Sequence, residues 1–250
     1  MIAALQRARL VVTYWLSWVL FIVVGLLLNL GCAPLLLLPR RTGRGRTVRR
    51  LIRGLFTFWV NWQGASGVVD VRFVGFDRPL PPRTVFIANH PTLVDATFLL
   101  SRLPDTICIF KPALMRHPAI GPAAVMAGYA SGDNGIDLIR DATARINAGQ
   151  SLLVFPEGTR TQPGTVLGPL KPGFALIASR ARAAVQLVVV RASPELARRG
   201  RPWWHPPAVL PAFVEFTLDQ RWEADAFVTP TKLTAAVDAR LRTVLGTTTA

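Results

Sequence analysis

The stretch Thr84–Asp95, which reads TVFIANHPTLVD, decides the fold of this 250-residue chain. Its first five residues form a short apolar run that is typical of a buried strand, and Pro91 stands in the first turn of the helix that follows. A strand, a tight turn and a helix in this order are typical of an open α/β sheet, in which ligands bind beyond the carboxyl ends of the strands. His90 is therefore expected at such an edge.

His90 and Asp95 are spaced so that the carboxylate can fold back onto the ring from just over one turn into the helix. An imidazole with a pKa near about 6.5 accepts a proton at neutral pH, and a carboxylate on its other nitrogen orients it, as in the base half of a catalytic triad. No serine or cysteine stands obviously beside the pair as a nucleophile, which indicates that the histidine activates a hydroxyl of the substrate. Taken alone, the pattern also fits a histidine that caps the helix and is satisfied by Asp95.

A second turn follows the apolar run Ser151–Phe155 and reads PEGTR over residues 156–160. Arg160 offers a planar fork of donors that suits phosphate or carboxylate. Gly158 lets the backbone approach a ligand, and Glu157 can brace the arginine or accept a substrate hydroxyl. If the two strands are parallel, both turns lie at the same edge of the sheet.

The pairing of N-H-P-x-x-x-D with E-G-T-R at this spacing resembles the glycerolipid acyltransferase family, whose type member is 1-acylglycerol-3-phosphate acyltransferase, over roughly residues 68–195. The resemblance implies transfer of an acyl group from acyl-CoA or acyl carrier protein to the hydroxyl of a lysophospholipid, with His90 as the general base and Asp95 holding its tautomer. It implies an acceptor-binding set that comprises Lys111, Glu157, Gly158, Thr159 and Arg160.

Two places depart from the family's pattern. Gly128–Asn134 lies where the family has a block that ends in arginine, so Asn134 replaces this residue and weakens the case for an acceptor with a free phosphomonoester. The strand-like run Val185–Val190 lacks the proline of a further block. The residue sequence that begins at Gly128, together with the run PWWHPP at 202–207, is more similar to the subgroup associated with aryl polyene and xanthomonadin-type pigment pathways. This subgroup would use a different acceptor. The alternative of another class is a catalytically idle membrane adaptor, against which the intact histidine and aspartate argue.

The N-terminal region is typical of a membrane anchor. Val11–Leu30 carries no charge and, at about 20 residues, is long enough to span a bilayer. It is too long for the apolar core of a signal peptide, and no small-x-small cleavage site follows it. Arginines are more numerous after the run than before it, so the positive-inside rule predicts a bacterial-type inner (cytoplasmic) membrane with the catalytic domain on the cytoplasmic side. A hairpin broken at Gly31–Pro34 would give the same side.

The charge balance of the whole chain fits this interpretation. Lys and Arg number 29 against 14 Asp and Glu, a formal net charge of +15. Such a balance is compatible with nucleic acid, but the basic residues flank lipid-type segments and no nucleic-acid motif occurs, so anionic lipid headgroups are the expected partner. With 3 histidines and no clustered cysteines, the sequence predicts no metal site, and no cofactor is expected.

The remaining pattern predicts an α/β fold with a mixed, layered sheet flanked by helices. We expect residues 1–62 to form a membrane-anchoring segment with a basic interfacial helix at 47–62, and residues 63–250 to form one catalytic domain. Two interpretations of Trp203 and Trp204 are equally compatible with the sequence. They contact lipid at the entrance of the site, or they belong to a simple hairpin that covers the domain. The expected strands are near 69–74, 84–88, 106–110, 151–155, 185–191 and 208–217, and the expected helices of the catalytic domain are near 92–102, 113–127, 136–148, 170–182 and 230–244.

Overall fold

The computed structural model describes residues 2–37, 43–118, 120–132, 135–193, 196–226 and 229–246. Within these residues seven strands form one sheet in the order β1-β7-β6-β2-β5-β3-β4. The strands are β1 (Val69–Val74), β2 (Val85–Ala88), β3 (Thr106–Phe110), β4 (Ala130–Ser131), β5 (Ser151–Val154), β6 (Val185–Ala192) and β7 (Ala212–Trp222).

The sheet is mixed, as the sequence predicts. The strands β6, β2, β5, β3 and β4 are parallel to one another, so their carboxyl ends meet at one edge. β7 is antiparallel to β6, and β1 pairs parallel with β7. Every residue of β2 and β5 is buried, which agrees with their unbroken apolar sequences, because a strand covered on both faces has no exposed side to fill with polar residues.

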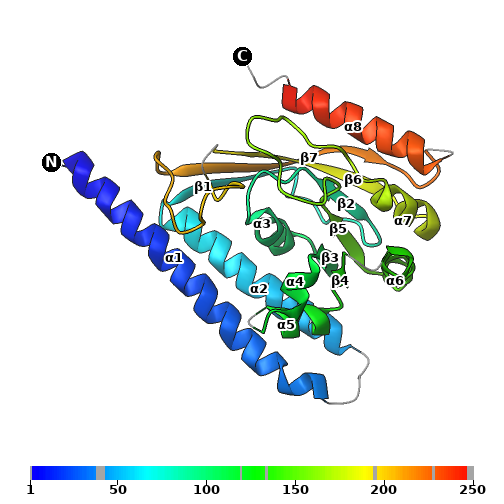
Figure 1. Ribbon diagram of the computed structural model, residues 1–250, viewed down its shortest axis with the longest axis horizontal. Helices are drawn as coiled ribbons and strands as arrows, with labels where there is room; N and C mark the ends of the chain where they lie inside the picture. Colours follow the sequence, from blue (N-terminus) through cyan, green and yellow to red (C-terminus); the bar gives the residue numbers. More distant parts are fainter. Residues whose placement is uncertain are drawn as a thin grey trace.

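Helices cover both faces of the sheet (Figure 1). On one face α3 packs against the strands, α2 packs against α3 and β1, and α1 lies outside α2. On the other face α7 contacts α6 and α8 and lies close to β2, while α8 contacts β6. The helices are α1 (Ile2–Cys32), α2 (Arg44–Ala65), α3 (Asp95–Arg102), α4 (Pro112–Arg116), α5 (Gly121–Ala127), α6 (Gly135–Asn147), α7 (Gly173–Ala181) and α8 (Pro230–Gly246), with a short 3₁₀ helix at Pro34–Leu37.

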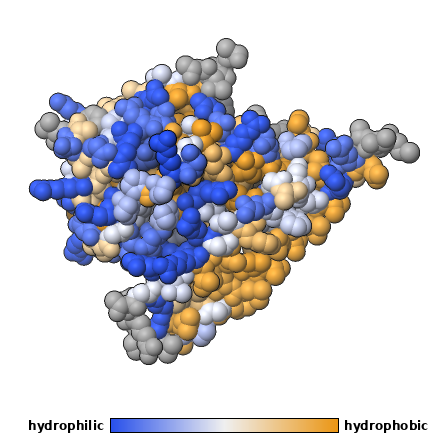
Figure 2. Space-filling model, turned by 180° about the vertical axis from the view of Figure 1, so that it is seen from behind, coloured by the Kyte–Doolittle hydropathy of each residue, from blue (hydrophilic) through white to orange (hydrophobic). Residues whose placement is uncertain are grey.

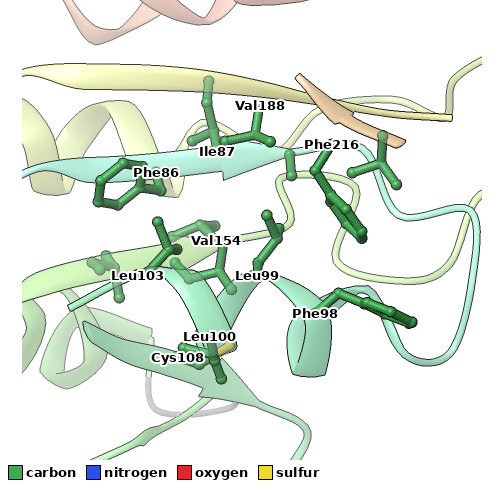
Figure 3. Close-up of a cluster of buried hydrophobic side chains, with 14 of the residues drawn as sticks. Phe86, Ile87, Phe98, Leu99, Leu100, Leu103, Cys108, Val154, Val188 and Phe216 are labelled. Atoms are coloured by element: carbon green, nitrogen blue, oxygen red, sulfur yellow. The ribbon is translucent and has the colours of Figure 1, made fainter. Parts of the chain in front are cut away.

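The helix α3 brings the first sequence motif into the main core. Phe98 and Leu99 are at most 1% exposed and point toward β2 and β7, where Phe98 stacks on Phe216 with 5.5 Å between ring centroids (Figure 3). Because α3 begins at Asp95, burial of its apolar face also fixes the position of this aspartate relative to the end of β2.

Two expected elements differ from the sequence prediction. The helix expected at 113–127 is two helices, since Pro118 disfavours helical backbone at His117, where α4 ends. Gly121 begins α5 in a place where a Cβ would lie 2.2 Å from the Met115 carbonyl oxygen, so only glycine fits. The last strand begins at Ala212 rather than near 208, because Pro211 has no amide hydrogen to add to the ladder.

The helix α1 is attached to the rest of the molecule along one face. Trp59 in α2 donates its indole N–H to the Ser17 carbonyl at 2.8 Å, and Trp62 donates to the Ser17 hydroxyl at 2.9 Å. At the far end of the helix the Asn29 side chain accepts the N–H of Ala123 at 2.9 Å. These contacts hold α1 alongside the domain over most of its length.

The opposite face of α1 is apolar and exposed. By length and composition, the segment Ala4–Leu37 could cross a membrane. Figure 2 shows hydrophobic residues gathered along the side of the molecule that α1 forms. The large exposed side chains of α1 are Leu5, Val12, Trp15, Leu16, Val19, Ile22, Val23, Leu26, Leu27 and Leu30.

Candidate active site

The turn after β2 is pinned to β6 by Asn89. The Asn89 side-chain amide donates to the Val190 carbonyl at 2.8 Å, and its oxygen accepts the Val190 N–H at 2.8 Å. A side chain thus replaces the two ladder bonds that a further strand residue would form. The chain can leave the sheet at this point without leaving buried β6 groups unpaired, and the next residue, His90, is directed out of the sheet edge.

His90 and Asp95 are in contact as the sequence predicts. The His90 Nδ1 lies 2.8 Å from the Asp95 Oδ2, with 17% of the histidine side chain exposed and none of the aspartate side chain. Asp95 also accepts the backbone N–H of Thr92 at 2.8 Å and the Thr92 hydroxyl at 2.5 Å. Because the carboxylate acts as an acceptor, Nδ1 carries the proton of a neutral imidazole and Nε2 keeps its lone pair.

The ring of His90 is fixed on a second side by Phe155, the last apolar residue before the second turn. The two rings stack with 4.0 Å between centroids and an interplanar angle of 21°. Among the described residues, the His90 ring forms a side-chain hydrogen bond with Asp95 and with no serine or cysteine. The Cys108 thiol is buried in β3, and burial raises its pKa to about 12. These contacts are compatible with the expectation that the histidine acts on a hydroxyl of a substrate.

The second turn is joined to the first through Glu157. This buried carboxylate accepts the His90 N–H at 3.1 Å, the Thr161 hydroxyl at 2.8 Å and the Gly168 N–H at 2.9 Å. A backbone bond from Thr161 N–H to the His90 carbonyl at 2.8 Å completes the link. These bonds give Glu157 a role in joining the two turns; the expected roles of bracing Arg160 or accepting a substrate hydroxyl stay predictions.

Gly158 and Thr159 lie at the tip of the second turn. Gly158 has a φ of +67°, and a Cβ there would lie 2.9 Å from the Lys171 Nζ. The glycine thus allows both the left-handed backbone and the close approach of a cationic side chain. Thr159 is partly exposed next to it. The tip of this turn therefore lies beside an ammonium group that the sequence prediction did not include among the site residues.

Arg160 is half-buried at the same edge. Its guanidinium donates to the Ala197 carbonyl at 3.2 Å. Burial lowers the pKa of Arg160, the nearby Arg199 lowers it further, and Asp95 acts in the opposite direction. An arginine in this setting stays charged at neutral pH and has unused N–H donors for an anionic ligand.

Of the two remaining candidate residues, Lys111 lies within the described residues and Asn134 lies outside them. Lys111 follows β3 at the carboxyl edge, one strand beyond β5. It is exposed and is the N-cap residue of α4, and its carbonyl accepts the Leu114 N–H at 2.9 Å. Asn134 lies outside the described residues, so the departure from the family's pattern at this position stays a sequence observation.

Comparison with known proteins agrees with this geometry. Residues 72–191, which include both turns, match the family model described as Acyltransferase. This part of the chain, just under half of it, is similar to the acyltransferase family.

Two curated relatives and one solved structure show how far the likeness extends. The chain is 33% identical to a 1-acyl-sn-glycerol-3-phosphate acyltransferase of Cocos nucifera over 115 residues, which cover 43% of this chain and 37% of that protein. It is 26% identical to the protein of the same name in Helicobacter pylori over 157 residues, covering 60% and 62%. The chain thus matches about a third to two thirds of the length of these relatives.

The likeness in structure covers more of the chain. The crystal structure of the 1-acyl-sn-glycerophosphate (LPA) acyltransferase PlsC from Thermotoga maritima superimposes with a TM-score of 0.71 over 98% of each chain, at 18% sequence identity. At that identity the match establishes the fold, including the arrangement of an N-terminal helical part beside the acyltransferase sheet.

Several residues of the candidate site were not identified from the sequence. Thr92 holds both oxygens of Asp95, Phe155 stacks on the histidine ring, and Asn89 secures the turn. Each stands inside or next to a quoted motif, so the signal was their position, one to three residues from a candidate site residue. Lys171 is 13 residues from Gly158 in sequence; the run Lys171–Ala175 resembles the family's start of the helix after the second turn, but the resemblance did not place Lys171 at the site.

Proposed function

We propose that the chain is an acyltransferase that moves an acyl group from an acyl thioester to the hydroxyl of a lysophospholipid such as 1-acylglycerol-3-phosphate. The observation that carries the proposal is the His90 ring, held on Nδ1 by the buried Asp95 and left with a free lone pair on Nε2. The curated relatives, which are named for acyl transfer to 1-acylglycerol-3-phosphate, support the acceptor class.

The proposed reaction is a direct transfer between the two substrates. His90 Nε2 takes the proton of the acceptor hydroxyl, and the oxygen attacks the thioester carbonyl carbon. A C–O ester bond forms, the C–S bond breaks, and the leaving thiolate receives the proton from the imidazolium. Asp95 keeps its negative charge throughout and stabilises the imidazolium that forms.

The remaining site residues are proposed to bind rather than to react. Arg160, Gly158 and Thr159 lie where the polar head of an acceptor would meet the second turn, and Lys111 offers a further cation at the same edge. Glu157 is proposed to keep the two turns in register through its three hydrogen bonds. The donor is acyl-CoA or acyl carrier protein, both of which are anionic and suit a basic face.

The N-terminal part is proposed to hold the enzyme on the membrane that contains its lipid substrate. Because one face of α1 is attached to the domain through residues 17 and 29, a helix that crossed the bilayer would draw the domain into it. We therefore propose that α1 lies in the membrane surface with its exposed apolar face among the lipids. The anchoring part is residues 1–62, the acyltransferase domain is residues 63–250, and the domain faces the cytoplasm at the inner membrane of a bacterial-type cell.

Acyl transfer by the full-length protein tests the proposal. Labelled acyl-CoA and acyl carrier protein would be offered with lysophosphatidic acid, lysophosphatidylethanolamine and an aryl polyene alcohol, so that the pigment-pathway acceptor competes directly. We expect transfer to lysophosphatidic acid and a loss of about 10²–10⁴-fold in kcat/KM for His90→Ala. His117→Ala, an exposed histidine at the end of α4, is the matched control and should keep wild-type turnover. Wild-type turnover in His90→Ala would overturn the assignment.

A further inference from the structure

The segment that follows β6 forms an arginine-lined pocket beside the two motif turns. Because β6 is parallel to β2, its carboxyl end reaches the same sheet edge as His90. The pocket has a volume of about 500 Å³ and is lined by Pro163, residues 198–202 and His205. Three of these lining residues are arginines: Arg198, Arg199 and Arg201.

The backbone of this segment is held against both turns. The Ala197 carbonyl accepts the Leu93 N–H at 3.0 Å, and the guanidinium of Arg160 donates to the same carbonyl at 3.2 Å. Arg198 forms an isolated antiparallel bridge with Thr92, the residue that binds Asp95. The pocket is therefore built against the catalytic turns by main-chain contacts that do not use the side chains of Arg198 and Arg199.

The far side of the pocket is tied to α1. The Tyr14 hydroxyl donates to the Trp203 carbonyl, and the ring of Trp203 lies 4.8 Å from that of Trp18. Arg201 donates to the Pro206 carbonyl at 2.9 Å, which closes the loop on itself. The pocket thus lies between the catalytic edge and the helix with the exposed apolar face.

The charges of the pocket are arranged for an anion. Among the residues that the structure describes, no acidic side chain lines it, and neither Arg198 nor Arg199 forms a salt bridge. Arg199 lies near enough to Arg160 to lower the pKa of that guanidinium, second only to burial. An anion that binds between guanidinium groups lining one pocket is stabilised by their charge, and their planar donor forks match phosphate oxygens.

We propose that this arginine pocket binds a phosphate group of one of the two substrates of the acyltransferase, with Arg198 and Arg199 as the main contacts. The proposal rests on the proposed function and adds a binding site on the loop after β6 to the residues of the two motif turns. The phosphate belongs either to the headgroup of the lysophospholipid acceptor or to the nucleotide end of coenzyme A. Both groups present the same oxygens, and the experiment separates them.

Equilibrium binding to the full chain in detergent, without turnover, is the primary measurement. The two probes are lysophosphatidic acid and coenzyme A. The test variant is Arg198→Gln/Arg199→Gln. The matched control is Arg140→Gln/Arg180→Gln, which removes two positive charges from exposed positions on α6 and α7. Thermal melts of all variants check that the fold is kept, and Arg199→Lys tests how much of the binding needs the planar fork.

We expect the Kd of one probe to rise at least about ten-fold in the test variant and to stay within about two-fold in the control. A rise for lysophosphatidic acid alone assigns the pocket to the acceptor, and a rise for coenzyme A alone assigns it to the donor. In turnover, the KM for that same substrate should rise while kcat stays near the wild-type value. If the wild type transfers acyl groups and the test variant binds both probes with unchanged affinity, the proposal that this pocket binds phosphate is wrong and the proposed function stands. A wild type without transfer to any acceptor overturns the proposed function itself.

Discussion

The carboxyl edge of the sheet and the helix α1 are positioned by different kinds of contact. At the edge, two buried carboxylates each accept three hydrogen bonds, so the distances around His90 are set by charged groups with all their partners in place. Along α1, polar side chains that include Tyr14, Ser17 and Asn29 attach one face, and the other face carries exposed apolar side chains. The first region depends on exact distances between polar groups, whereas the second depends on the area of exposed apolar side chains. Substitutions should therefore affect the two regions in different ways.

The largest expected effect is at the edge, in Asp95→Asn. An amide cannot accept all three hydrogen bonds, and it no longer stabilises an imidazolium, so we expect kcat/KM for acyl transfer to fall at least about 10²-fold. Thr92→Val, which removes one bond to the carboxylate, should cost about ten-fold. Steady-state kinetics on lysophosphatidic acid measure both. Equal losses in the two variants would contradict the view that the charge of Asp95 matters beyond its geometry.

The second prediction concerns the exposed face of α1. Val19→Gln/Leu27→Gln should weaken binding to anionic phospholipid vesicles about ten-fold, because two exposed apolar side chains, 56% and 63% exposed, no longer enter the lipid. Vesicle sedimentation measures this partition. Val74→Gln/Ile136→Gln changes two exposed apolar residues outside α1 and should bind like the wild type. If both double variants lose binding equally, α1 is not the membrane face.

The sequence predicted the centre of the site well and its surroundings poorly. His90 and Asp95 lie within one turn of each other, so their contact needed only the local conformation that the strand, proline and apolar helix pattern already indicated. Glu157 was identified as important, but its partners lie on three different segments and its joining role follows from the pairing of β2 with β5. Arg199 had no local signature, since its closeness to Arg160 arises only when β6 is laid beside β2.

The same contrast applies to the N-terminal region. An apolar run of that length was interpreted as a possible span, and its length and composition agree with that interpretation. Ser17 and Asn29 are polar positions within this run, and both of them contact the domain. The pattern therefore carried the signal for a one-sided helix, and the missing information was the partner: Trp59 and Ala123 belong to elements far away in the sequence. The division of the chain at residue 62 stays a prediction.

The third prediction separates a joining role for Glu157 from a chemical one. Glu157→Gln keeps the shape but places an amide N–H against either the His90 N–H or the Gly168 N–H, so we expect a lower Tm by about 3–8 °C and roughly ten-fold lower turnover. Differential scanning fluorimetry and kinetics at the same temperature measure the two effects. A large loss of kcat with an unchanged Tm would instead mean that Glu157 contacts the substrate.

The smallest expected effect lies away from both regions, at the ion pair between β7 and α8. Arg240 donates two hydrogen bonds of 2.7 Å to the carboxylate of Asp219, and this contact lowers the pKa of Asp219 below its ordinary value. Since the pKa is lower in the folded than in the unfolded state, the pair stabilises the fold at pH values above about 4 and loses this contribution as the pH falls through the folded-state pKa. Asp219→Asn should therefore lower the Tm by about 1–3 °C at pH 7. The difference from the wild type should shrink on acidification toward pH 3, while acyl transfer at pH 7 stays unchanged because the pair lies on β7 and α8, outside the two turns that hold the candidate site. A Tm difference that grew as the pH was lowered would mean that the carboxylate is not stabilised in the folded state.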